Sequence, residues 1–297
     1  MRILVTGVSS YVGSYLAESL SAQGHEVIGT YRRVNERVKK LSKYSRINLT
    51  KIDLGKITDV KGLTRDFDAV VHNAGSFPWL DVDISNVIDC NVIGTLNLAN
   101  WLKESDADVR VVLYSTLSVY GKIVDEILTE STPTNPTEVY GSSKLTAEHL
   151  MTEVSGCKNQ LIIRFPIVLG KDAHRAFIPR MVENFLSNKP VEIANPTKLY
   201  NSMSTLKAVA EFTNHYLVSN FESSFITNIG SEKPIPIIEI AEYLKFQTGS
   251  RSKMNINPKE SNCYLINNSL AIQLGYKPPT VQEALNFYAT ESGWLRS

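Results

Sequence analysis

Short apolar runs alternate with stretches of helical periodicity along the first part of the chain. Five runs suit strands that are buried on both faces: Arg2–Val5, Glu26–Gly29, Ala69–His72, Val109–Tyr114 and Gln160–Phe165. Between them, apolar residues recur at helical spacing over Ser14–Gln23, Asn91–Glu104 and Tyr140–Ser155. This alternation predicts an α/β fold in which a doubly wound parallel sheet carries helices on both faces.

The pattern loosens after Gly170, where prolines such as Pro179, Pro190, Pro234 and Pro278 divide the chain into short elements. Proline interrupts helices and central strands, so this part predicts a smaller, mixed lobe. We therefore expect residues 1–168, joined by parts of 205–230, to form the larger domain. Residues 169–297 are expected to form the smaller one.

The composition is that of an ordinary globular protein without marked charge. The 297 residues are 43% hydrophobic and 21% charged, and the formal net charge of +1 argues against a dedicated nucleic-acid binder. Cys90, Cys157 and Cys263 are widely spaced and odd in number, so neither a disulfide framework nor a metal site is expected. Because the sequence opens on an apolar strand and has no run of membrane-spanning length, we expect a cytoplasmic protein that does not bind membranes.

The segment TGVSSYVG, residues 6–13, joins the first expected strand to the first expected helix. In a dinucleotide-binding loop, the outer glycines allow a tight turn and close helix packing, and a small residue between them lets the pyrophosphate approach. Gly7 and Gly13 hold the outer positions, and Ser10 stands where the middle glycine is usual. The loop predicts a dinucleotide site in which the Ser10 hydroxyl donates to a phosphate. The alternative is a strand-turn-helix without a ligand.

The end of the second expected strand indicates which dinucleotide binds. NAD sites usually place an acidic residue here for the ribose 2′-hydroxyl, but this chain has Tyr31 followed by Arg32 and Arg33. Guanidinium groups suit a 2′-phosphate, so the pattern favours NADP, with NAD as the second choice. The lysines that follow are interpreted as part of a solvated helix.

Tyr140 and Lys144 are four residues apart at the start of an expected helix, and residues at this spacing share a face. A nearby ammonium favours the phenolate and would lower the pKa of the tyrosine. Ser115 and Thr116 end a buried strand at the edge where open α/β sheets bind ligands. These residues suit proton exchange with a substrate oxygen. A surface helix pair and a plain strand end are the structural alternatives.

Six motifs in order resemble those of the extended short-chain dehydrogenase/reductase family, which contains nucleotide-sugar epimerases, dehydratases and 4-ketoreductases. They are TGVSSYVG, VVHNAG, NVIGTLNL, YSTLSVYG, YGSSK and IRFPIVLG. The resemblance continues more weakly to LGYKPP near the C-terminus. It implies a Rossmann domain followed by a smaller, mixed substrate-binding lobe.

The resemblance also implies roles for the expected catalytic residues. Tyr140 would be the general acid/base, Lys144 would bind the nicotinamide ribose and lower the Tyr140 pKa, and Thr116 would orient the substrate oxygen. His72 would be a strand-end residue and not a proton donor. Relatives often dimerise through helices that correspond to residues 91–104 and 140–155, so a homodimer is expected.

Cofactor contacts are implied over much of the larger domain. Gly7, Ser10, Tyr11 and Val12 would approach the pyrophosphate, while Arg32, Arg33, Asp53 and Leu54 would lie at the adenosine end. The remaining contacts would be Asn73, Ala74, Gly75, Asn91, Ser115, Tyr140, Lys144, Phe165, Pro166 and Val168, with Asn91 bracing the central sheet.

Two departures from the family pattern bear on the reaction. The segment YNSMSTLK, residues 200–207, lacks an arginine and an aspartate that many relatives carry there, so substrate contacts are expected to differ. Dehydratases follow the strand-end threonine with Asp-Glu, whereas this chain has Leu117 and Ser118. Elimination of water needs a carboxylic acid and a carboxylate, so dehydration is not expected.

We therefore expect an NADPH-dependent reductase of a nucleotide-activated 4-keto-deoxysugar, with Tyr140 as proton donor. The first alternative is an NAD-dependent nucleotide-sugar 4-epimerase, although such enzymes resemble one another in having an acid where this chain has Tyr31. The second is a non-catalytic NADP-binding sensor, in which a loss at Tyr140 or Lys144 would be expected.

Overall fold

The computed structural model describes residues 1–77, 83–104, 109–174, 176–257 and 263–294, and it divides the chain into two compact units. Unit 1 comprises Met1–Lys122, Pro133–Phe165 and Ala210–Thr227, and unit 2 comprises Ile123–Thr132, Pro166–Val209 and Asn228–Ser297. The division thus falls before Pro166, where the sequence suggested a boundary after Val168, and residues 123–132 group with unit 2.

Unit 1 is built on a seven-stranded sheet in the order β12-β7-β5-β4-β1-β2-β3. Its strands are β1 (Arg2–Thr6), β2 (Glu26–Tyr31), β3 (Ile47–Lys51), β4 (Ala69–His72), β5 (Arg110–Thr116), β7 (Gln160–Phe165) and β12 (Phe225–Asn228). β1 pairs in parallel with both β2 and β4. Because the strand order runs outward in opposite directions from β1 and β4, the crevice at their carboxyl ends is the topological switch point.

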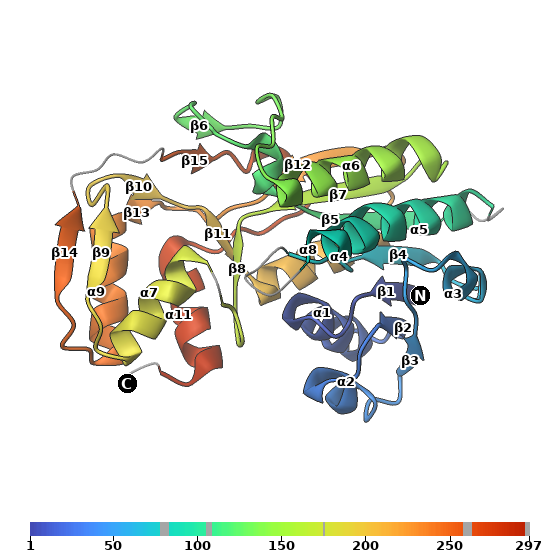
Figure 1. Ribbon diagram of the computed structural model, residues 1–297, viewed down its shortest axis with the longest axis horizontal. Coiled ribbons are helices and arrows are strands. Elements are labelled where there is room, and N and C mark those ends of the chain that lie inside the picture. The colour runs from blue at the N-terminus through green and yellow to red at the C-terminus, as the bar shows by residue number, and fades with distance from the viewer. Residues whose placement is uncertain (78–82, 105–108, 175, 258–262, 295–297) are drawn as a thin grey trace. The chain divides into compact units, whose positions relative to one another are not determined.

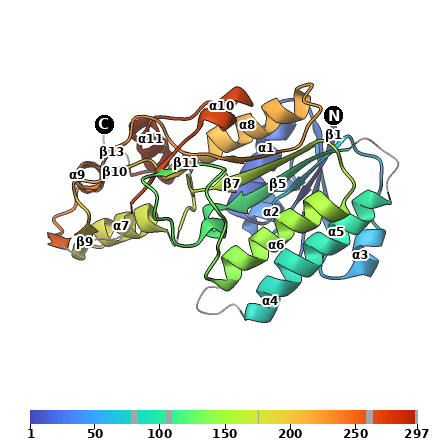
Figure 2. The same cartoon turned by 90° about the horizontal axis from the view of Figure 1, so that it is seen from above.

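Helices cover both faces of this sheet (Figure 1). On one face lie α4 (Ile84–Ile88), the π-helical turn η1 (Asp89–Ile93), α5 (Gly94–Lys103) and α6 (Val139–Val154). α1 (Tyr11–Ala22) and the part of α8 (Leu206–Val218) within unit 1 lie on the other face (Figure 2). Short connections are made by α2 (Glu36–Leu41), α3 (Ile57–Lys61) and the 3-10 helix η2 (Leu117–Tyr120). The predicted doubly wound α/β fold is confirmed.

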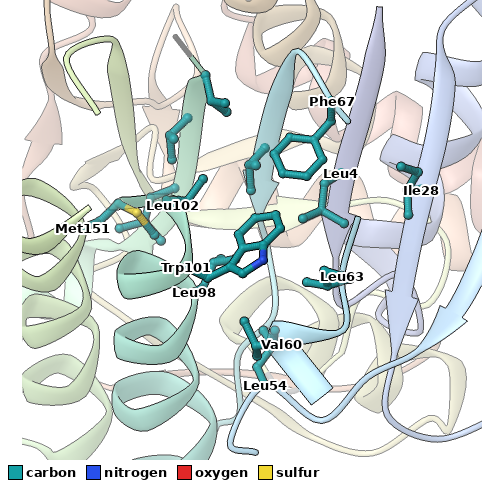
Figure 3. Close-up of a cluster of buried hydrophobic side chains, with 14 of the residues drawn as sticks. Leu4, Ile28, Leu54, Val60, Leu63, Phe67, Leu98, Trp101, Leu102 and Met151 are labelled. Carbon is teal, nitrogen blue, oxygen red and sulfur yellow. The ribbon is translucent and has the colours of Figure 1, made fainter. Parts of the chain in front are cut away.

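A cluster of buried apolar side chains joins the sheet of unit 1 to α5 and α6 (Figure 3). α5 contributes Leu98, Trp101 and Leu102, whose spacing of three and four residues places them on one helix face. The Trp101 ring stacks on Phe67 with centroids 5.0 Å apart. Met151 brings α6, the helix that carries Tyr140 and Lys144, into the same cluster.

Unit 2 combines short strand pairs with helices. Its helices are α7 (Phe177–Leu186), α9 (Ile237–Thr248), α10 (Ser269–Gln273) and α11 (Val281–Ser292). Its strands pair as β10 (Leu199–Tyr200) with β13 (Ile235–Pro236), β11 (Met203–Thr205) with β8 (Ile167–Leu169), β14 (Met254–Asn257) with β9 (Val191–Ala194), and β15 (Leu265–Ile266) with β6 (Ile127–Leu128). α11 begins at a capping box in which the Thr280 hydroxyl accepts from the Glu283 amide and the Glu283 carboxylate accepts from the Thr280 amide.

The divergent segment Tyr200–Lys207 stabilises unit 2 through buried polar contacts. The Asn201 side chain donates to the carbonyls of Ser231 and Ile266, at 3.1 and 3.0 Å. The Ser204 hydroxyl lies 2.8 Å from the Tyr276 phenol oxygen. These side chains therefore hold strands and connecting segments of the same unit together.

Candidate active site

A pocket in unit 1 lies at the switch point, at the carboxyl ends of the central strands. It is lined by Gly7, Ser9, Ser10, Thr30, Tyr31, Arg32, Ile52, Asp53, Leu54, Gly55, Asn73, Ala74, Gly75, Ser76 and Cys90. Eight of these were predicted cofactor contacts: Gly7, Ser10, Arg32, Asp53, Leu54, Asn73, Ala74 and Gly75. Open α/β sheets bind their ligands in this crevice.

The loop between β1 and α1 approaches its neighbours too closely for side chains at two positions. Gly7 has φ +72°, and a Cβ there would lie 2.7 Å from Cα of Ala74. A Cβ on Gly13 would lie 2.5 Å from both the Asn73 side-chain nitrogen and the Gly7 carbonyl oxygen. Both glycines are thus required by the turn, and the N-terminus of α1 beside it presents amides that suit a phosphate. This cradle fits a dinucleotide.

Ser10 caps α1, which explains how a serine fits the middle glycine position. Its hydroxyl oxygen accepts from the Gly13 amide at 3.0 Å and from the Asn73 side-chain amide at 3.1 Å. A hydroxyl oxygen has two acceptor positions and one donor hydrogen. Since both acceptor positions are used inside the protein, the hydrogen is left to donate into the pocket that Ser10 lines.

We expect Ser10→Val to weaken dinucleotide binding by at least tenfold, because the branched side chain crowds the pyrophosphate and removes this donor, which contributes about 1.5–3 kcal/mol when it bonds a charged group. Ser10→Gly also removes the donor but should weaken binding less, because glycine is nearly as good a helix cap and adds no bulk. Calorimetric titration with NAD and NADP would measure both. Unchanged affinity in the valine variant would show that the loop is only structural.

The two arginines that follow β2 differ in their position relative to the pocket. Arg32 lines the pocket, whereas Arg33 is exposed and lies outside the lining. Arg37, just beyond them on α2, donates to the Ser9 carbonyl at 3.5 Å. Asn35 donates to the same carbonyl at 2.9 Å. The start of α2 therefore supports the loop, a contact that the sequence pattern did not indicate.

The three predicted catalytic residues come together beside this pocket. Tyr140 lies in the first turn of α6, and its phenol hydrogen-bonds the Thr116 hydroxyl at the end of β5. Lys144 lies one helical turn later and is only 4% exposed. The Phe77 ring packs edge-on against Tyr140, with centroids 4.5 Å apart, and was not predicted.

Burial determines the protonation of the tyrosine and the lysine. It raises the pKa of Tyr140 to about 12, and the hydrogen bond from Thr116 opposes this rise. Burial also lowers the pKa of Lys144 to about 8, while Cys90 and Glu148 act in the opposite direction. The lysine was expected to lower the Tyr140 pKa, but desolvation of the phenolate is the larger effect and raises it. Tyr140 is therefore a phenol and Lys144 mainly an ammonium at neutral pH.

Cys90 connects the lysine to the pocket. Burial raises the pKa of its thiol, and the positive charges of Arg32 and Lys144 both oppose that rise. An arginine at the end of β2 and a lysine on α6 thus act electrostatically on the same pocket residue. Sequence reasoning missed Cys90 because a single cysteine within a helical pattern carries no signal for a site.

Arg164 and Glu148 form a buried ion pair between β7 and α6, the helix that carries Tyr140 and Lys144. The Arg164 guanidinium on β7 donates to both oxygens of Glu148 on α6, at 3.1 and 2.7 Å. Arg164 also donates to the Tyr120 hydroxyl at 2.8 Å. The Ser115 hydroxyl donates to Glu148 as well. The side chain of Ser115, a predicted cofactor contact, is therefore directed to this ion pair.

The remaining predicted contacts lie outside the pocket lining. Tyr11 and Val12 form the first turn of α1, and burial followed by the influence of Tyr140 raises the Tyr11 pKa to about 12. The Phe165 ring lies 4.6 Å from that of Tyr114. Pro166 and Val168 belong to unit 2. Asn91 is buried beside Ser76 and Ser143.

Within the described part of the chain, no group of three or more His, Cys, Asp or Glu side chains could hold a metal ion. The helices there include none that is long and apolar enough to cross a membrane.

Residues 3–212 match a family described as "NAD dependent epimerase/dehydratase family". The chain belongs to this family. The resemblance inferred from the six motifs is thereby confirmed, and the pocket, loop and Tyr140–Lys144 pair lie within the matched residues.

Similarity to individual members extends over most of the chain. It is 25% identical to the putative UDP-glucose 4-epimerase of Methanocaldococcus jannaschii, with 93% of each chain covered. It is 29% identical to the GDP-mannose 4,6 dehydratase of Cricetulus griseus over 63% of this chain and 53% of that protein. The crystal structure of UDP-glucuronic acid 4-epimerase from Bacillus cereus in complex with NAD superposes with a TM-score of 0.82 at 23% identity, covering 98% of this chain and 99% of that one.

Membership of the NAD dependent epimerase/dehydratase family identifies the chain as an NAD(P)-dependent enzyme of the extended short-chain type. The glycine-bounded cradle fits the dinucleotide that such enzymes use, and the catalytic residues lie beside it. The sequence analysis preferred a 4-ketoreductase to a 4-epimerase, and these relatives do not support that preference. Among them, the 4-epimerases match over the greater length.

Proposed function

We propose that the protein is a nucleotide-sugar 4-epimerase that works with a bound nicotinamide dinucleotide. The observation that carries this proposal is the Thr116–Tyr140–Lys144 set beside the dinucleotide pocket, followed by Leu117 and Ser118. Neither residue can transfer a proton as a carboxyl group does, which argues against dehydration. Full-length similarity to a putative UDP-glucose 4-epimerase supports the same reaction class.

The residues of the site would divide the work of a reversible oxidation at one sugar carbon. The bound dinucleotide supplies hydride acceptance and return. Tyr140 would take the proton of the sugar hydroxyl as the phenolate and give it back as the phenol, with Thr116 hydrogen-bonding the same oxygen. The Lys144 ammonium would favour this phenolate, which burial alone makes the minor form at neutral pH. Ser10 and the N-terminus of α1 would hold the pyrophosphate.

The test is incubation of the purified protein with UDP-glucose, UDP-galactose and UDP-glucuronic acid, with products separated by chromatography. An epimerase interconverts a pair of 4-epimers with no net change in NAD(P)H. Stoichiometric loss of NADPH with a nucleotide 4-keto-sugar would instead identify a reductase. Tight dinucleotide binding without conversion across a wider set of nucleotide sugars would favour a sensor.

One observation favours the NADPH-dependent 4-ketoreductase as a second candidate: Arg32 lines the pocket where an acidic residue would suit NAD. If Arg32 binds a 2′-phosphate, Arg32→Ala should lower NADPH affinity relative to NADH by about 1–3 kcal/mol. Arg33→Ala is the matched control, because Arg33 is exposed and outside the lining. Wild-type protein that binds NADH as tightly as NADPH would exclude this contact and weaken the reductase candidate.

We also propose a homodimer formed through the outer face of α4, η1 and the start of α6. This face exposes Ile84, Ile88, Ile93 and Val139, with exposed fractions of 54%, 39%, 37% and 38%. Exposed apolar side chains that cluster on a surface mark interaction sites. Ile88→Asp should convert a dimer into a monomer in light scattering, whereas Ile272→Asp, at an exposed isoleucine of unit 2, should not. A monomeric wild type would disprove the proposal.

A further inference from the structure

His72, the last residue of β4, is completely buried between two threonines. Its Nδ1 lies 2.8 Å from the Thr6 hydroxyl oxygen at the end of β1. Its Nε2 lies 2.9 Å from the Thr95 hydroxyl oxygen on α5. The direction of each of these hydrogen bonds follows from the other partners of the two threonines.

The Thr6 hydroxyl can only donate to the histidine. Its oxygen accepts from the backbone amides of Asn73 and Ala74, at 3.1 and 3.0 Å, and backbone amides cannot accept. With both acceptor positions used, the Thr6 hydrogen points to Nδ1 of His72. That ring nitrogen therefore carries no proton. The two amides belong to the turn after β4 that lines the dinucleotide pocket.

The Thr95 hydroxyl can only accept from the histidine. It donates its one hydrogen to the Asn91 carbonyl at 2.7 Å, because a carbonyl has no hydrogen to give. Nε2 of His72 must then carry the proton that it shares with Thr95. Both ends of the ring thus require the same neutral tautomer, with hydrogen on Nε2.

The contacts continue from Asn91 to the helix that carries the catalytic pair. Asn91 lies in the π-helical turn η1, and its side-chain amide donates to the Ser143 hydroxyl at 2.9 Å. Ser143 in turn donates to the Tyr140 carbonyl at 2.8 Å. Single π-helical turns are often found at functional sites. One series of contacts thus joins the pocket turn at Asn73 and Ala74 to the first turn of α6.

We propose that His72 is a positioning residue that, as the neutral Nε2–H tautomer, aligns the dinucleotide-binding turn after β4 with the catalytic helix α6. His72 itself is not among the residues that line the described pocket. The neutral ring also leaves the charge of Lys144 undisturbed, because a second cation nearby would disfavour the lysine ammonium. Burial, and then the Lys144 charge, lower the pKa of His72 to about 3.

The first test observes the ring directly in protein labelled with ¹⁵N-histidine. The chain has five histidines. The ring signals that disappear from the spectrum of the His72→Gln variant are those of His72. We expect one protonated ring nitrogen, identified as Nε2 by its coupling to both ring carbon-bound hydrogens, and no titration between about pH 5 and pH 9, where an ordinary imidazole titrates. Protonation on Nδ1, or titration within this range, would overturn the proposal.

The second test separates the two halves of the contact series. His72→Gln places an amide nitrogen near the position of Nε2 and so keeps the donor to Thr95. His72→Asn places an amide near the position of Nδ1 and so keeps a partner for Thr6. His72→Leu keeps neither contact. We expect His72→Leu to lower kcat by roughly 10²-fold with little change in KM, since a misplaced catalytic group costs about this much. The two amide variants should each retain more activity.

Controls keep this outcome distinct from general damage and from the proposed reaction. His149→Gln, at an exposed histidine on α6, should leave kcat unchanged. Equal kcat in the wild type and a folded leucine variant would overturn the positioning role. If the leucine variant does not fold, the asparagine and glutamine variants still test it, and wild-type rates in both would overturn it. The kinetic test rests on the proposed function, whereas the labelling test needs no substrate and remains decisive if the epimerase proposal fails.

Discussion

Tyr140→Phe should lower turnover by roughly 10²–10⁴-fold, the range for loss of general acid–base catalysis. The change removes the transferable proton while the ring keeps its packing against Phe77. Dinucleotide affinity should stay close to that of the wild type, because Tyr140 lies outside the pocket lining. Steady-state kinetics with the sugar nucleotide identified by the screen, together with calorimetric titration of the cofactor, would measure both effects.

The control for loss of a buried phenol is Tyr114→Phe. Tyr114 is also buried, but its phenol bonds Thr213 on α8, at 2.7 Å, and not a catalytic residue. This variant should lose some stability and keep its turnover. Thr116→Ala should reduce turnover less than Tyr140→Phe, because it removes an orienting hydrogen bond and not the proton. A Tyr140→Phe variant that stays within threefold of the wild type would exclude Tyr140 as the acid/base.

The pH dependence of kcat/KM should carry the signature of Lys144. Burial lowers its pKa from 10.5 to about 8, so the ammonium is present below that pH and is lost above it. If the ammonium stabilises the phenolate in the transition state, activity should decline as pH rises through about 8. Lys144→Met should remove this decline together with most of the activity.

Separating Arg164 from Glu148 should have the largest effect on stability. The two side chains are 6% and 1% exposed, and the guanidinium donates to both carboxylate oxygens. Arg164→Met leaves the Glu148 charge buried without its ion-pair partner, which typically costs about 3–5 kcal/mol of unfolding free energy. Urea denaturation followed by circular dichroism would measure the loss.

Two further variants distinguish the buried charge from the loss of packing. Replacing both partners, as Arg164→Met with Glu148→Leu, should be less destabilising than Arg164→Met alone, because no charge is then left unpaired. Glu36→Ala breaks an exposed pair with Lys39, whose side chains are 87% and 63% exposed, and should cost at most about 1 kcal/mol. An Arg164→Met variant as stable as the wild type would mean that Glu148 is neutral or solvated.

Features of the fold and site that depend on residues close together in the sequence could be predicted from the sequence. The strands Ala69–His72 and Gln160–Phe165 were predicted with the bounds that the structure has, because both faces are buried and the apolar run is uninterrupted. β3 was missed because it is a half-exposed edge strand, INLTK, in which only Ile47 is buried. The predicted helix at residues 91–104 begins in the π-helical turn η1, for which no sequence pattern was available.

The same distinction applies to the site. Gly7, Ser10 and Gly13 lie within one loop and the first turn of α1, and Tyr140 and Lys144 are one helical turn apart, so spacing alone placed them. Cys90 and Phe77 reach the site through contacts between distant segments, which spacing does not reveal. The direction of the Tyr140 pKa shift was wrong for the same reason, since the burial that raises it is supplied by residues far away in the sequence.

The composition of unit 1 from three separate stretches constrains the order in which the protein can fold during synthesis. β12, which pairs with β7 at the edge of the sheet, is not made until the ribosome reaches Asn228 of 297 residues. The Arg110 guanidinium likewise finds its carbonyl partners, Tyr216 and Leu217, only in this late stretch. Until then β7 is an open sheet edge, the type of surface that invites pairing with another chain. Nascent chains therefore have an interval of exposure to aggregation in which chaperones can act, although the dinucleotide-binding loop has long been synthesised.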